Sequence, residues 1–110
     1  MNIEDLEKLV KLASFLKQSD EPKSDDMWTV GKKYFIRTVT MHLVGKLIKI
    51  TDKEMLLEDA SWIADSGRFH DALKTGEFEE IEPFVNDVIV NRNSVIDATE
   101  WLFDLPKQQK

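Results

Sequence analysis

The sequence predicts one mainly β domain, a small barrel of about five strands with an N-terminal α-helix and a short helical insertion. A chain of 110 residues that is 42% hydrophobic suits one domain with a modest core. Residues 33–63 carry strand-type apolar spacing, and residues 84–103 read as strand, turn and strand. We expect a helix over 1–18, a linker over 19–26, first strands over 27–64, an insertion over 65–83, last strands over 84–105 and a tail over 106–110.

The N-terminal residues have the spacing of an amphipathic helix. Asn2 is a suitable N-cap residue. Apolar residues then recur at helical spacing, namely Ile3, Leu6, Leu9, Val10, Ala13 and Leu16. Leu12 and Phe15 widen this stripe beyond what packing on one surface requires. These two side chains either belong to the core under the barrel edge or contact a second subunit.

The first strands come from one long run and its return. We expect residues 33–50 to form a single strand, bent at Gly45, and residues 54–63 to pair with it after a turn at 51–53. One parity of the run is apolar and predicted to be buried: Phe35, Val39, Met41, Leu43 and Leu47. The other is largely polar and predicted to face solvent: Tyr34, Thr38, Thr40, His42 and Lys46.

The second half begins with an insertion. Residues 68–76 predict a short helix that stops at Gly76, and the acidic residues 77–83 predict an edge strand or loop. Residues 84–90 and 95–103 predict two strands around the polar turn 91–94, and the tail is expected to fray.

This order of elements resembles the Sm-like (Lsm) family of small β-barrels. The residues that match its first motif are Gly45-Lys46-Leu47, Asp52 and Met55-Leu56-Leu57-Glu58-Asp59-Ala60. The second motif is matched loosely by Val90-Asn91-Arg92-Asn93-Ser94-Val95. The resemblance implies a barrel and ring-like self-association. A barrel of the SH3-like or OB-like type is the alternative.

Two departures from the Sm-like pattern concern RNA. Leu56 stands where the family has an RNA-contacting Asn, and Asn93 stands where it has Gly after the Arg. Because those family residues line a uridine-binding pocket, the resemblance implies assembly more than RNA binding.

Charge is unevenly distributed along the chain, whose net charge is -6. Residues 28–53 hold six basic residues and one acidic residue, whereas residues 54–104 hold thirteen acidic and three basic residues. Opposite patches suit head-to-tail association or binding of a polyanion, although both could be merely solvated faces. A site for RNA or single-stranded DNA would use Lys46, Lys49, Arg37, Asn91 and Arg92.

Aromatic residues give this nucleic-acid hypothesis its stacking faces. Tyr34, Trp28 or Trp62 could stack on bases. Trp62 and Trp101 are nevertheless expected in the core, as aromatic residues usually are in a small domain.

Surplus apolar residues predict self-association. Trp101, Leu102 and Phe103 are consecutive, and a strand with one wet face buries only alternate side chains. Leu102 is therefore expected to contact the N-terminal helix or a neighbouring subunit. The candidate self-association residues are Leu12, Phe15 and Leu102, and the expected partner is a homo-oligomer or a larger protein assembly.

No residue pattern predicts catalysis, a metal site or a cofactor. His70 and Asp71 beside Arg68 form the most enzyme-like group, but adjacent helical residues do not face each other, so we expect a surface turn. Two histidines and no cysteine make a metal centre improbable. The acidic N-terminus and the lack of a long apolar run predict a cytoplasmic protein without membrane contact. We therefore expect a non-enzymatic structural or adaptor protein.

Overall fold

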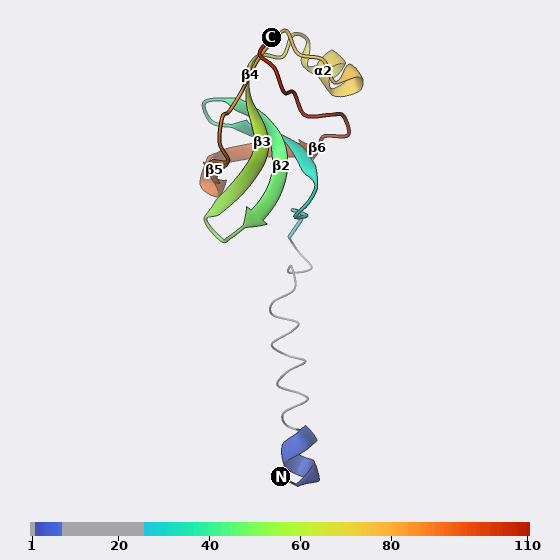
Figure 1. Ribbon diagram of the computed structural model, residues 1–110, viewed down its shortest axis with the longest axis vertical. Coiled ribbons are helices and arrows are strands. Elements are labelled where there is room, and N and C mark those ends of the chain that lie inside the picture. The colour runs from blue at the N-terminus through green and yellow to red at the C-terminus, as the bar shows by residue number, and fades with distance from the viewer. Residues whose placement is uncertain (1, 8–25) are drawn as a thin grey trace.

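The computed structural model describes residues 2–7 and 26–110, and its second part is mainly β (Figure 1). The strands are β1 (Lys33–Thr38), β2 (His42–Ile50), β3 (Glu54–Asp65), β4 (Glu80–Pro83), β5 (Val88–Asn91) and β6 (Val95–Glu100). The helix α2 (Phe69–Thr75) and the 3-10 helix η1 (Arg92–Ser94) complete the elements. No helix among the described residues is long and apolar enough to cross a membrane.

The N-terminal helix is described only where it begins. Residues 3–7 are helical, and the Asn2 side chain accepts a hydrogen bond from the Asp5 backbone N–H at 2.8 Å, as the predicted N-cap should. Leu12, Phe15 and most of the predicted linker lie outside the described residues.

The six strands form one antiparallel sheet in the order β4-β3-β2-β1-β6, and β5 pairs with β3. The twelve-residue β3 carries β5 along its first residues and β4 along its last ones. Within the described chain β6 pairs only with β1, so the sheet is open and the expected closed barrel is not observed. The reason is that β5 passes into β6 through η1 without a ladder between them (Figure 1).

The run 33–50 is two strands, so the prediction of a single bent strand was wrong. A turn over residues 39–41 separates β1 from β2. Thr38 forms it: its hydroxyl donates to the Met41 carbonyl at 2.8 Å, and its oxygen accepts from the Met41 N–H at 3.1 Å. A threonine side chain thus replaces the glycine or proline that usually signals a turn.

The bend expected at Gly45 coincides with an irregularity in the β2–β3 ladder. Val44 pairs with Ser61 and Lys46 with Glu58, so β3 holds an extra residue opposite Gly45. A Cβ atom on Gly45 would lie 3.0 Å from the Ala60 Cβ, so the two strands come too close for an ordinary side chain.

Each face of the sheet carries a cluster of buried residues, which corrects the predicted alternation. One cluster contains Tyr34, Ile36, Leu43, Leu47, Met55, Leu57, Ala60 and Val90. The opposite cluster contains Phe35, Val44, Ile63, Ala72, Phe78, Ile81 and Trp101. We call these the inner and outer clusters. Tyr34, expected to face solvent, is buried, whereas Val39 and Met41, expected in the core, are exposed.

The insertion and the tail provide the outer covering. The α2 helix ends at Gly76 with φ 77°, as predicted, and buries Ala72. The acidic segment forms the edge strand β4. The tail does not fray: Lys110 and Ile81 exchange two backbone hydrogen bonds, at 2.9 and 3.0 Å. Of the predicted last strands, only 88–91 and 95–100 are strands.

Candidate interaction surface

The β4 edge of the sheet is protected against pairing with another chain. Pro83 lacks a backbone donor, Glu80 and Glu82 add negative charge, and Lys110 occupies the backbone of Ile81. A further side-chain hydrogen bond joins Gln109 Nε2 to Glu82 Oε1 at 3.1 Å. This edge therefore uses several devices by which proteins avoid edge-to-edge association.

The β5 edge has none of these devices, and β6 has charge but no proline. The sequence of β5 is VIVN, without charge or proline, and Ile89 is 66% exposed. In the described chain β5 pairs only with β3, and β6 only with β1. Each strand consequently offers one row of backbone N–H and C=O groups to a further strand.

The acidic residues of β6 are paired within the chain. Arg37 donates from Nε to Asp97 Oδ1 at 2.7 Å, and its Nη2 contacts Asp97 Oδ2. This hydrogen bonding lowers the pKa of Asp97, and the Arg37 pKa is raised by the same contact. Lys32 Nζ lies 3.6 Å from Glu100 Oε2. Lys and Arg side chains of the same chain neutralise these two carboxylates. The carboxylates therefore protect the β6 edge against strand addition less than unpaired charges would.

On the inner face, β6 contributes Val95 to the packing but no buried residue after it. Ala98 pairs with Ile36, which is fully buried in the inner cluster, yet Ala98 itself is exposed. Every residue of β6 after Val95 is exposed. The inner cluster thus ends at this edge of the sheet.

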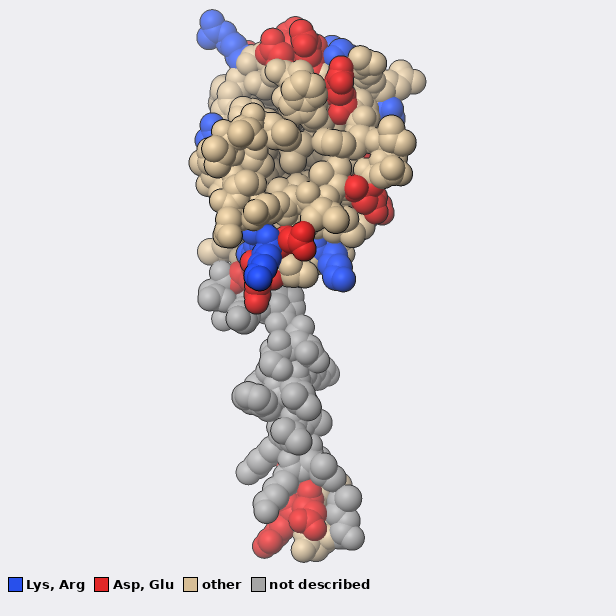
Figure 2. Space-filling model, turned by 90° about the vertical axis from the view of Figure 1, so that its left-hand side faces the viewer, with Lys and Arg blue, Asp and Glu red and all other residues tan. Residues whose placement is uncertain are grey.

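An open groove of about 190 Å³ adjoins β5, lined among others by Met41, Phe84 and Ile89. Among the described residues, none that lines it is charged. We define the apolar patch by the exposed apolar residues that line this groove, Met41, Phe84 and Ile89, together with their exposed sequence neighbours Val39 and Val85. The side of the molecule that carries β5 has few charges at its centre, as Figure 2 shows. Exposed apolar surface of this kind commonly marks an interaction site.

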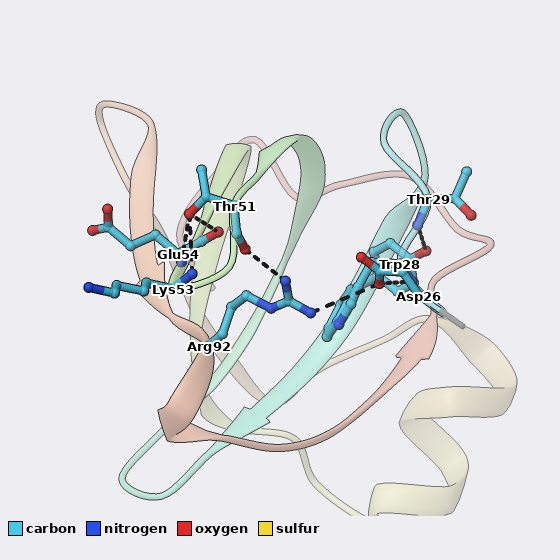
Figure 3. Close-up of polar contacts among 8 residues, drawn as sticks. Asp26, Trp28, Thr29, Thr51, Lys53, Glu54 and Arg92 are labelled. Carbon is cyan, nitrogen blue, oxygen red and sulfur yellow. Dashed lines mark hydrogen bonds and ion pairs between the residues drawn. The ribbon is translucent and has the colours of Figure 1, made fainter. Parts of the chain in front are cut away.

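Arg92 holds three segments together near η1 (Figure 3). Its Nη1 donates to the Thr51 carbonyl at 2.7 Å, and its Nη2 lies 3.9 Å from Asp26 Oδ1. The Asn91 side chain accepts the Asn93 N–H at 2.9 Å. These two predicted nucleic-acid residues therefore stabilise the turn and the entry of the chain into the domain.

The remaining predicted basic residues are not gathered into one site. Arg37 binds Asp97 and lies 5.0 Å from the centre of the Phe69 ring. Lys46 and Lys49 on β2 form no ion pair with a described residue. Lys46 is half-buried, and Lys49 is exposed. Three of the five candidates are thus engaged inside the molecule.

The aromatic predictions have mixed outcomes. Trp101 is buried as expected, whereas Trp62 is 41% exposed and the prediction of core burial was wrong. Tyr34 is buried and packs edge-on against Trp28, with ring centres 4.9 Å apart. Leu102 is 77% exposed, so the described chain does not cover it.

Catalytic and metal-binding side chains are not clustered in the described chain. His70 and Asp71 are exposed on α2, and Asp59 pairs with Lys107 at 3.2 Å. The described residues contain no group of three or more His, Cys, Asp or Glu that could hold a metal ion.

The apolar patch was missed by sequence reasoning. Val39 and Met41 were assigned to the core because they share the parity of Phe35 in what was read as one strand. A signal for the patch was present in the sequence: the short, apolar and uncharged stretch VIVN is followed by VIDATE, which has few bulky residues.

Comparisons with protein-family models, with curated proteins and with solved structures found no match.

Proposed function

We propose that this chain is a non-catalytic β module that associates with copies of itself, as a structural or adaptor component of a larger assembly. The observation that supports this most is the contrast between sheet edges: β4 is protected, whereas β5 and β6 are not. A module selected to remain monomeric would be expected to protect all three.

The two available edges differ, so pairing between them is head-to-tail. Strand β5 of one copy would add to β6 of the next and cover Ala98 on the inner face. A head-to-tail contact closes into a ring or continues as a filament, according to the rotation between copies. Ring closure is also what the resemblance to Sm-like proteins implies.

Native mass spectrometry of the full chain at micromolar concentration and low salt tests this proposal. We expect oligomers for the wild type, and mainly monomers for Ile89→Lys and Thr99→Lys, which place a charge at each available edge. Glu80→Lys on the protected β4 edge is the matched control and should leave the oligomers unchanged. A wild-type chain that is monomeric throughout would refute self-association.

A nucleic-acid-binding Sm-like module is the second candidate, supported by the two β2 lysines without ion pairs. It predicts salt-dependent binding of a U-rich single-stranded oligonucleotide. In Lys49→Ala the slope of log affinity against log salt concentration should fall by the amount expected for about one lost phosphate contact. Arg92→Ala is expected to weaken binding as well. An unchanged anisotropy signal in a low-salt titration would remove this candidate.

A further inference from the structure

Edge pairing alone leaves part of the exposed apolar surface unexplained. The four residues of β5 span about 13 Å, and a stable interface usually buries about 1,600 Å² in total. A ladder of that length needs additional contact. The apolar patch adjoins β5 and is itself uncovered, so it is the natural extension of the interface.

The described start of the N-terminal helix has a matching apolar surface. Ile3 is 76% exposed and Leu6 is 55% exposed, so neither is covered by the chain's own domain. The sequence continues the apolar spacing beyond them, through Leu9 and Val10. Both faces of the sheet already have a core formed by the domain itself. The apolar face of this segment therefore requires a partner.

The chain enters the domain at a point that the Arg92 side chain of η1 reaches. Asp26 lies next to Arg92 of η1, which joins β5 to β6, and Trp28 N–H donates to Asp26 Oδ1 at 3.0 Å (Figure 3). The predicted linker preceding Asp26 can extend by about 3.4 Å per residue, hence more than 20 Å. The N-terminal segment can thus extend well beyond its own domain, toward an adjacent copy paired along the sheet edge.

We propose that the apolar patch of one copy binds the N-terminal segment, residues 3–16, of a second copy. This inference rests on the proposed self-association. A helix that lays apolar residues at i and i+3 into an apolar groove is a common mode of recognition. Ile3 and Leu6 would contact the patch beside Met41 and Phe84.

Two single-cysteine variants of the otherwise cysteine-free full chain test this arrangement. Glu7→Cys lies beside the apolar face of the segment, and Thr40→Cys lines the groove, so neither removes a proposed contact. The Glu7→Cys thiol is first converted to a mixed disulfide with 5-thio-2-nitrobenzoate and then mixed with Thr40→Cys. A covalent 7–40 product in this mixture can only join two chains.

We expect this product to form. It should fall about tenfold or more when Leu6→Glu is added to the activated chain, because a leucine that the proposed contact would bury is replaced by a charge. Lys74→Glu on α2 is the control and should change nothing. A disulfide that forms only within a chain carrying both cysteines would contradict the inference, because the segment would then bind its own domain. Oligomers in native mass spectra without the 7–40 product would overturn this inference alone, whereas monomers alone would overturn the proposed function too.

Discussion

Gly76 is the residue at which the end of α2 and the tail meet. It has φ 77°, which L side chains rarely adopt, and a Cβ atom there would overlap the ring of Phe103. The Phe103 ring in turn packs edge-on against Trp101 of the outer cluster, with ring centres 5.1 Å apart. One glycine thus allows the insertion and the tail to cover the same face of the sheet.

Replacing Gly76 should therefore destabilise the domain. We expect Gly76→Ala to lower the free energy of unfolding by about 2–4 kcal/mol, from backbone strain and overpacking together. Gly31→Ala is the control: Gly31 has φ 98° but open space around it, so only backbone strain of about 1–2 kcal/mol applies. Urea denaturation measures both, and equal losses would show that the Phe103 contact is unimportant.

Replacing Ser61 should have the opposite effect on stability to replacing Gly76. The Ser61 hydroxyl is fully buried between β2 and β4, with no hydrogen-bond partner among the described residues. Ser61→Ala should leave stability unchanged or raise it by about 1 kcal/mol, because an unsatisfied polar group is removed. Ser94→Ala, which loses a 2.7 Å hydrogen bond to the Asn91 carbonyl, should instead lower it by about 1 kcal/mol. Thermal unfolding that shows a marked loss for Ser61→Ala would point to a partner of that hydroxyl.

At the scale of elements, the sequence predicted the turn and the helix end whose hydrogen bonds and backbone angles depend on neighbouring residues. The turn at 51–53 is held by the Thr51 side chain, which accepts the Glu54 N–H at 3.0 Å, and α2 ends at its glycine. The burial of both sheet faces was not predictable, because the covering residues come from distant segments. The exposed Leu102 was anticipated from three consecutive large apolar residues. The apolar patch was missed because the turn that exposes Met41 has no glycine or proline.

The pairing of β1 with β6 should depend on pH through Asp97. Hydrogen bonding from Arg37 lowers the Asp97 pKa, so the stabilising contribution is present above the ordinary value of about 3.9 and is lost as pH falls through the lowered value. The melting temperature of wild type should exceed that of Asp97→Asn at pH 5–7, and the gap should shrink below about pH 4. Asp87→Asn changes an exposed carboxylate that forms no ion pair with a described residue, and it should show no such gap. A gap independent of pH would contradict this assignment.

At the scale of the whole molecule, the sheet has one protected edge, β4, and two edges, β5 and β6, that could pair with a further strand. The tail and Pro83 complete β4, whereas the inner cluster stops at an exposed β6 and the apolar patch lies beside β5. These features become mutually consistent if copies join head-to-tail. Two of the residues predicted to bind nucleic acid, Arg92 and Arg37, instead join segments of the fold.

Cross-linking of the cysteine-free chain tests this head-to-tail pairing most directly. Ile89 and Thr99 are exposed and lie on the outer face of β5 and β6, so they would be neighbours across the interface. With a short bifunctional thiol reagent, the Ile89→Cys, Thr99→Cys double variant should give a ladder of covalent oligomers. An equimolar mixture of the two single variants should stop at the dimer, and each single variant alone should remain uncross-linked. Cross-linking of either single variant alone, or none in the double variant, would contradict head-to-tail association through β5 and β6.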